Sequence, residues 1–580
     1  MFNKFRNQKK VPGLILIGGL FVIGCHFTQQ TIPTDAGGSC FTGSQALTDV
    51  EFNSWFETGA VSLNGAVKPA NSVAFPNVPN CSFYKWSEQM FLWLTSPAPA
   101  RYGGNGLVMN SSAFYDVSLP DQNGERQFLP HTPGLVRAFN LRTAQKGLLD
   151  LPVVREKKTL RLLEIIPAQL SPAGKQLIMD KNGIEKEIGD VRIQENKAPV
   201  LMDVTGKEIE APKAMMQSLT VTKMKRDTAV LPFMRKMNKL ENFDRTSLVQ
   251  KIVLGKNILF LDLAGNFHET EQGMADGNVL MAQNRSLVYY SLTVNNVFAL
   301  YRTMQGSSVA SGTSFPTTQT NLNAISAFAI ANGKSPIIDS FALAVEIKCS
   351  WVEAKGLPDS NKFIKMKAIV PTYDTTDPGD WKPNGTKTIE LAMVGMHVVG
   401  STAGHPELLW ATFEQLSNDP VAAYSYTTTT GSNTPIPQST AGKWMFCTDA
   451  SAGPFNESHI FMDGDHIKPT PGHTIGPSDI LRIMPWGLPG TNSGGNAQVI
   501  SINSKARSLL DANDVRRNYI QTGTTWTIFG ASPNNSNQVG TNVLANTTME
   551  TFTQGSNCFS CHTTNTTAVS HIFDETKPLF

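Results

Sequence analysis

The sequence predicts an α+β fold whose main body is β-rich, built on an antiparallel sheet or sandwich with helical insertions. Charged residues make up only 17% of the 580 residues, and the chain contains 46 Gly and 34 Pro, as expected for short strands joined by turns. Patterns typical of strands become dense from about residue 285 onward. The length suits about two to four domains.

The first 24 residues have the composition of an export signal. A basic leader with Lys4, Arg6, Lys9 and Lys10 precedes a short apolar stretch, residues 11–24, which suits a signal-peptide core better than a membrane span. The stretch ends in Val-Ile-Gly before Cys25, which resembles the lipobox of bacterial lipoproteins. That resemblance implies that residues 1–24 are removed and that Cys25 is lipidated; an uncleaved anchor with an incidental cysteine is the alternative.

The resemblance also bears on location, because the residue after a lipidated cysteine influences sorting. His26 occupies this position instead of the Asp that retains lipoproteins in the inner membrane, so we expect an outer-membrane anchor, on either the periplasmic or the surface face. Residues 25–75 show weak periodicity and many small polar residues, and we expect them to form a flexible tether.

The globular body is expected over residues 76–540, either as one unit or as two subdomains that meet near residue 285. Apolar residues from Phe83 to Leu94 fall on one helical face and predict a helix, and a polar helix is expected over 504–521. Strands are predicted at 287–294, 341–351, 363–370 and 389–399. The pair Asn384-Gly385 predicts a hairpin turn between the last two.

The strongest chemical signal lies in the C-terminal segment, residues 541–580, where a short helix over 542–553 is expected to precede it. Cys558, Cys561 and His562 form C-x-x-C-H, the attachment motif for c-type haem. Two thiols at this spacing can bond the two vinyl groups of one porphyrin, and the adjacent histidine becomes the proximal iron ligand. A redox-active C-x-x-C pair or half of a zinc site are the alternatives, but the accompanying patterns for these are missing.

The sixth iron ligand decides the chemistry of such a haem. His571 is the only histidine after the motif and is the first candidate; the alternative is a surface histidine near the terminus. Met549 upstream and His397 on a predicted strand are weaker candidates, since packing of its own helix explains Met549 and a lone histidine on an apolar strand face is more often a hydrogen-bonded core residue. The sequence leaves these options open.

The remaining cysteines fit an oxidising compartment. Cys40, Cys81, Cys349 and Cys447 form an even set, for which three disulfide pairings exist, and Cys349 is equally well explained as a buried thiol on an apolar strand face.

Five stretches together carry a further resemblance, namely 86–93, 345–348, 393–398, 409–414, and 544–551 before the Cys558 motif. They resemble a group of largely uncharacterised exported bacterial proteins, c-type cytochrome domain-containing lipoproteins with a single C-terminal haem motif. The resemblance spans most of residues 80–575 and implies one covalent haem but no substrate. Where relatives carry a histidine after Thr-Phe-Glu, this chain has Gln415, so no ligand role is expected there.

These observations favour an exported monohaem c-type cytochrome lipoprotein that acts in electron transfer. A haem-dependent periplasmic or surface oxidoreductase acting on a small molecule is the alternative, because the body is larger than an electron carrier needs. The expected partners are a redox protein or a small-molecule electron donor or acceptor. The net charge of +2 gives no sign of nucleic-acid binding.

Overall fold

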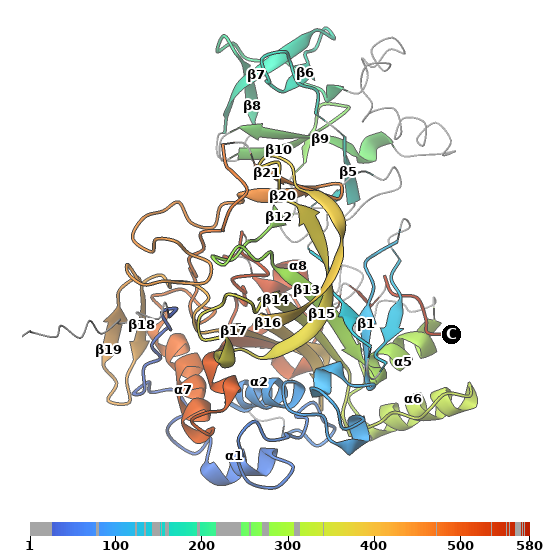
Figure 1. Ribbon diagram of the computed structural model, residues 1–580, viewed down its shortest axis with the longest axis vertical. Coiled ribbons are helices and arrows are strands. Elements are labelled where there is room, and N and C mark those ends of the chain that lie inside the picture. The colour runs from blue at the N-terminus through green and yellow to red at the C-terminus, as the bar shows by residue number, and fades with distance from the viewer. Residues whose placement is uncertain are drawn as a thin grey trace, which may run out of the picture.

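The structure is a computed structural model (Figure 1). It describes residues 26–76, 81–121, 125–132, 135–141, 151, 153–156, 162–166, 168–193, 198–215, 245–254, 257–268, 278–306, 314–339, 341–470, 472–534, 536–552, 554–555, 557–562, 570, 572–573 and 575–580. Cys25, His571 and the expected signal peptide lie outside these residues, and so does the side chain of Cys561.

A ten-stranded, almost entirely antiparallel sheet forms the centre of the described structure and confirms the predicted β-rich α+β fold. Its main path runs β2-β1-β13-β14-β16-β17-β22-β23, and β15 pairs with both β16 and the short β3. The strands are β1 (Phe114–Val117), β2 (Phe128–Pro130), β3 (Arg137–Ala138), β13 (Tyr289–Asn295), β14 (Val345–Glu353), β15 (Lys365–Asp374), β16 (Lys382–Thr402), β17 (His405–Gln415), β22 (Tyr519–Thr527) and β23 (Gln538–Gly540).

The helices α1 (Asp49–Trp55), α2 (Cys81–Leu94) and α7 (Ser493–Leu509) cover one face of this sheet. The predicted helix is present as α2. The ring of its Phe91 stacks on the ring of Phe413 in β17, with the centroids 4.5 Å apart. Beside it lie α1 and α7, while α5 (Asn296–Gln305) and α6 (Gln319–Ala331) pack together near β13 (Figure 1). The main apolar core lies between α2 and the sheet.

A separate lobe is inserted between β3 and β13, at the top of Figure 1. It contains a five-stranded and a three-stranded sheet. Its strands are β4 (Val153–Arg155), β5 (Leu162–Ile166), β6 (Leu177–Met179), β7 (Glu185–Arg192), β8 (Val200–Asp203), β9 (Leu248–Leu254), β10 (Asn257–Asp262) and β11 (Phe267–His268). The option of two subdomains meeting near residue 285 does not match this arrangement, since β1 to β3 precede the lobe and still belong to the central sheet.

Smaller sheets and one short helix complete the structure. They comprise β12 (Asn278–Val279), β20 (Ile460–Asp463), β21 (His466–Pro469), β18 (Tyr424–Thr427), β19 (Asn433–Ile436) and α8 (Cys558–Cys561). Three expectations fail here: the helix expected over 504–521 instead ends at Leu509 and gives way to β22, the segment 542–553 contains no helix among its described residues, and Asn384 and Gly385 lie inside β16. The register of β16 against β15 shifts beside Gly385, so this pair forms an irregularity in a strand rather than a turn.

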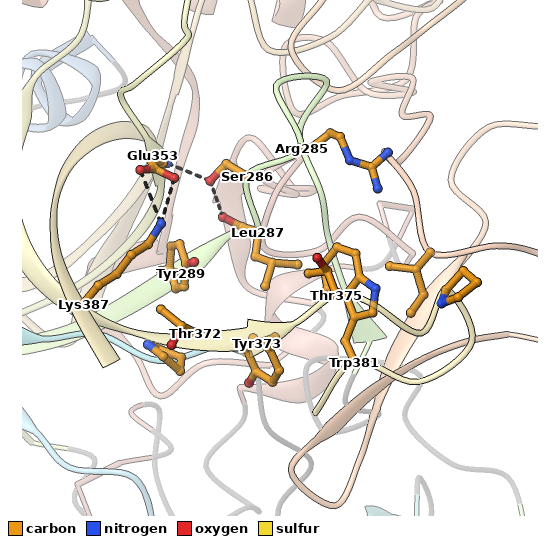
Figure 2. A pocket seen from close by; sticks show the side chains of 13 residues that line it. Arg285, Ser286, Leu287, Tyr289, Glu353, Thr372, Tyr373, Thr375, Trp381 and Lys387 are labelled. Carbon is orange, nitrogen blue, oxygen red and sulfur yellow. Dashed lines mark hydrogen bonds and ion pairs between the residues drawn. The ribbon is translucent and has the colours of Figure 1, made fainter. Parts of the chain in front are cut away.

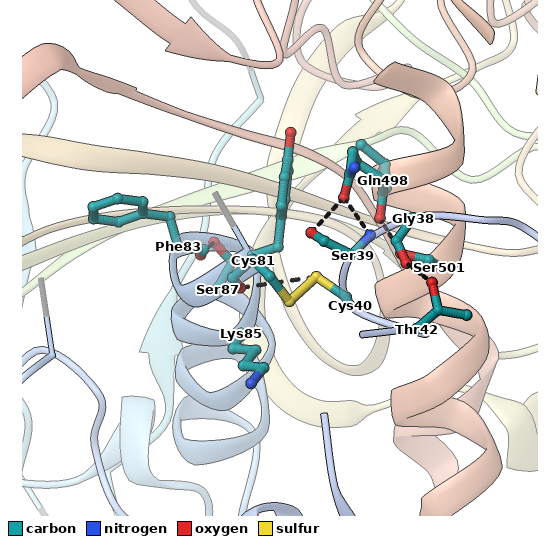
Figure 3. Close-up of a disulfide and its surroundings, with 12 residues drawn as sticks. Gly38, Ser39, Cys40, Thr42, Cys81, Phe83, Lys85, Ser87, Gln498 and Ser501 are labelled. Atoms are coloured by element: carbon teal, nitrogen blue, oxygen red, sulfur yellow. Dashed lines mark hydrogen bonds between the residues drawn. A yellow bond between two sulfur atoms is a disulfide. The ribbon is translucent and has the colours of Figure 1, made fainter. Parts of the chain in front are cut away.

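The expected tether is also wrong for residues 26–75, which pack on the body. Phe52, Phe56 and Val67 are fully buried, and α1 begins at a Thr48 cap. A disulfide between Cys40 and Cys81 ties this segment to the start of α2 (Figure 3). The structure thus packs residues 26–75 on the body, with some of their side chains in the core, instead of holding them as a spacer.

The other two unassigned cysteines remain separate thiols. Cys349 and Cys447 are both buried and unbridged. Burial raises the pKa of each thiol to about 12, so neither is reactive at neutral pH.

Candidate functional site

The C-x-x-C-H motif forms a capped helical turn. The Asn557 side chain accepts a hydrogen bond from the Phe559 N–H at 2.9 Å, and the His562 N–H donates to the Cys558 carbonyl at 3.0 Å. Phe559 is fully buried, which fixes the turn, whereas Cys558 and His562 are half-buried. Because positions 558 and 561 are three residues apart in a helical turn, they lie on the same side of it.

The body holds the histidine of the motif through an aromatic contact. The His562 ring lies 4.3 Å from the ring of Trp410, centroid to centroid, at 52°. The buried Trp410 Nε1 has no hydrogen-bond partner among the described residues. Trp410 belongs to β17, so the central sheet contacts the histidine of the motif directly.

The segment that precedes the motif covers the sheet face opposite α2. Several hydrogen bonds attach it. They include Thr412 Oγ1 to the Leu544 carbonyl (3.2 Å), Asn546 Nδ2 to the Phe413 carbonyl (3.0 Å), Tyr290 Oη to the Thr548 carbonyl (2.7 Å), and one between the hydroxyls of Ser350 and Thr548 (2.6 Å). We call residues 542–551 the anchoring segment. Polar side chains on this face therefore hold the segment together with its buried apolar residues, Leu544 and Met549 among them.

A buried ionic cluster lies under the anchoring segment. The Arg482 guanidinium is 2.8 Å from a Glu414 carboxylate oxygen and 3.0 Å from Asp419 Oδ1, and all three side chains are at most 1% exposed. Thr547 donates its N–H to Glu414 at 2.7 Å, and its hydroxyl lies 2.5 Å from Glu414 and 3.2 Å from Asp419. Arg482 also donates to Gln30 at 3.1 Å.

One guanidinium cannot neutralise two buried carboxylates. Burial raises the pKa of Asp419 to about 7, and the Glu414 charge adds to this while Arg482 opposes it. Asp419 is therefore the member of the cluster that takes up a proton near neutral pH.

His397, a candidate sixth ligand, uses both ring nitrogens within the protein. Nδ1 is 2.6 Å from Thr412 Oγ1, and Nε2 is 3.0 Å from a Glu550 carboxylate oxygen. Burial pushes the Glu550 pKa up, but the charge of His397 and its hydrogen bond outweigh this, and the pKa lies below its usual value. The arrangement is that of a structural histidine that fastens the end of the anchoring segment.

Met549, the other described candidate, is fully buried within the anchoring segment. Gln415, for which no ligand role is expected, is buried as well, and its Oε1 accepts from the Ser417 N–H and hydroxyl, both at 2.6 Å.

Sequence reasoning missed Trp410, Glu414, Asp419, Arg482 and Thr547. Trp410, Glu414 and Thr547 lie in the stretches that carry the resemblance, 409–414 and 544–551, which was the available signal. No feature of the sequence indicated that Asp419 or Arg482 belongs to the site. Within the described parts of the chain, no group of three or more His, Cys, Asp or Glu side chains is arranged to hold a metal ion. None of the described helices has the length and apolar character that crossing a membrane requires.

No protein-family model, no curated protein and no solved structure matches the chain. The resemblance to c-type cytochrome domain-containing lipoproteins therefore stays a prediction.

Proposed function

We propose that this chain is an exported monohaem c-type cytochrome lipoprotein that acts in electron transfer. The observation that carries the proposal is the capped turn Cys558–Cys561 with His562 set against Trp410 of the central sheet. A haem c bound there would supply reversible one-electron chemistry.

The residues of the turn fit this cofactor. Cys558 and His562 are both half-buried, so each is accessible from outside while its backbone is fixed by the cap. Cys558 and Cys561 would each add a thiol across one vinyl group to form a thioether, and His562 would be the proximal ligand. Trp410 would act as a positioning residue, because its contact with the imidazole limits rotation of the ring.

The anchoring segment supports the same role. It holds the residues just before the motif against Thr412, Glu414 and Asp419, so the motif cannot swing away from the body. A fixed orientation keeps the distance to a docked redox partner constant, whether that partner is a protein or a small molecule.

Denaturing gels stained for haem test the proposal. The full chain, produced in a host that matures c-type cytochromes, should keep the stain after denaturation, with one haem per chain by pyridine haemochrome. Replacing both Cys558 and Cys561 by Ala should abolish the stain, while Cys447→Ala, which removes a buried thiol elsewhere, should retain it. A stain that survives the double replacement would refute the proposal.

A haem-dependent oxidoreductase acting on a small molecule is the second candidate. The observation in its favour is that His397 has both nitrogens engaged and Met549 is fully buried, so neither is poised as a sixth ligand. If His571, outside the described residues, is not the ligand either, the sixth position is open. A high-spin ferric spectrum that changes with cyanide supports the oxidoreductase, and a low-spin spectrum insensitive to His397→Ala supports the electron carrier.

Lipid anchoring through Cys25, in the outer membrane, is part of the same proposal. The neighbouring His26 side chain is 68% exposed and lies 2.7 Å from Asp359 of the body. Mass spectrometry of the mature N-terminus should find a lipid on Cys25; a terminus at Met1 would contradict this.

A further inference from the structure

A pocket of about 480 Å³ opens where β13, β14 and the hairpin of β15 and β16 meet (Figure 2). Its volume is in the range of sites for small organic molecules. Three aromatic side chains line it, Tyr289, Tyr373 and Trp381, together with prolines, Leu287 and Ile475. The lining also contains three charged side chains, Arg285, Glu353 and Lys387.

Two of the charged groups neutralise each other. Lys387 Nζ lies 3.3 Å from a Glu353 carboxylate oxygen, as the dashed lines in Figure 2 show. The hydroxyl of Ser286 is also occupied, since it accepts from the Glu353 N–H at 2.7 Å and donates to the Leu287 carbonyl at 2.8 Å. These bonds stiffen the wall but leave its net charge unchanged.

Arg285 is different, because it is exposed at the pocket rim and its guanidinium has no partner among the described residues. Its backbone has a φ of +62°, in the left-handed region that favours Gly or Asn at such a turn. This conformation closes a turn in which the Arg285 N–H donates to the Ala282 carbonyl at 2.8 Å, so the turn occupies the backbone and leaves the guanidinium available to a ligand. The pocket therefore carries one uncompensated positive charge on its rim.

The remaining walls suit a ring. Tyr373 and Trp381 offer flat apolar surfaces, and burial together with the Asp465 charge raises the pKa of Tyr373 to about 12, so its phenol keeps its proton and can donate. Thr372 and Thr375 add two hydroxyls to the same lining.

We propose that this pocket binds a small organic acid in which a carboxylate is attached to a ring. Arg285 holds the carboxylate through its two parallel N–H groups, and the ring lies against Tyr373 and Trp381. Aromatic acids and sugar acids share this chemistry.

The site is distinct from the haem motif. Tyr289 lines the pocket from the α2 face of the sheet, whereas the next residue, Tyr290, points to the other face and donates to Thr548 of the anchoring segment. The proposal thus goes beyond electron transfer, and its failure would leave the haem assignment untouched.

Calorimetric titration of the full chain tests the proposal with two probes, benzoate and D-glucuronate, each compared with its neutral counterpart, benzamide or D-glucose. At least one acid should bind saturably, and its neutral counterpart should have a Kd that is higher by about tenfold or more. Arg285→Gln should raise the Kd of the acid by about tenfold or more, since it removes a charge-assisted hydrogen-bond pair. Arg192→Gln, at an exposed arginine in the lobe, is the matched control and should have no effect.

The outcome also identifies the class of ligand. Binding of benzoate alone indicates an aromatic acid, binding of D-glucuronate alone a sugar acid, and binding of both a site for the shared chemistry. Absence of binding at 10 mM (about a hundred times a typical ligand Kd of 0.1 mM) for both acids overturns the proposal. So does acid binding that Arg285→Gln leaves unchanged or that the neutral counterpart equals.

Discussion

The Thr547 hydroxyl is the one group of the anchoring segment that contacts both carboxylates of the buried cluster, so its removal tests whether this cluster holds the segment. Thr547→Val keeps the shape of the side chain and the backbone bond from Thr547 N–H to Glu414, but removes the hydroxyl contacts at 2.5 Å and 3.2 Å. Thr547 is fully buried, so water does not replace the lost donor.

The magnitude follows from the charge of the acceptor. A hydrogen bond to a buried charged group contributes ~1.5–3 kcal/mol, against ~1 kcal/mol for one between neutral groups. Arg482 still reaches both carboxylates in the variant, so the loss stays within this range. Thr551→Val is the matched control, because Thr551 is 1% exposed and donates only to the neutral Thr547 carbonyl at 2.6 Å.

Urea-induced unfolding followed by tryptophan fluorescence measures both variants. We expect Thr547→Val to lower the free energy of unfolding by ~2 kcal/mol and Thr551→Val by ~1 kcal/mol. Hydrogen exchange should also become faster at the amides of residues 546–551 in the Thr547 variant. Equal costs for the two variants, with unchanged exchange, would show that the ionic cluster does not hold the segment.

Three further predictions concern pH, the disulfide and the sixth ligand. The folded protein keeps a proton on Asp419 up to about pH 7 that the unfolded chain releases near pH 4, so the free energy of unfolding falls as pH rises between these values. Asp419→Asn should reduce this fall by on the order of 4 kcal/mol, measured by urea unfolding at each pH, and an unchanged fall contradicts the assignment. The Cys40–Cys81 bridge closes a loop with a sequence separation of 41, so replacing both cysteines by Ala should cost ~4 kcal/mol, and reductant should then no longer affect stability. If His571 is the sixth ligand, His571→Ala should shift the ferric spectrum from low spin toward high spin, and an unchanged low-spin spectrum excludes it.

Local patterns predicted the elements that depend on burial of one face. The α2 helix and the strands β13 to β16 follow from apolar periodicity, since each must bury a continuous face against the core. The turn expected at Asn384-Gly385 failed because β16 continues past it, with the register shift absorbed opposite Thr372 and Tyr373. The helix expected over 504–521 failed because pairing with β17 draws Tyr519 and the residues after it into the sheet.

The candidate site divides in the same way. The motif at Cys558 is contiguous, so the sequence alone identified it. Arg482 contacts residues that lie far apart in the sequence, and no local pattern predicts such contacts. The segment expected to be a tether lacks apolar periodicity because it packs through isolated anchors such as Phe52 and Phe56 and through the disulfide at Cys40. Low periodicity indicated an irregular backbone there, not mobility.

The contacts of Arg482 with distant parts of the chain also affect when the core can form during folding. This one side chain contacts Gln30, near the start of the described residues, Asp419 in the central part, and Thr547 close to the C-terminus. Contacts between residues this distant form slowly, because the loops between them must close first. The core cannot be completed until nearly the whole chain has been synthesised and, for an exported protein, translocated, so a truncated chain would expose its charged centre to water and to proteases.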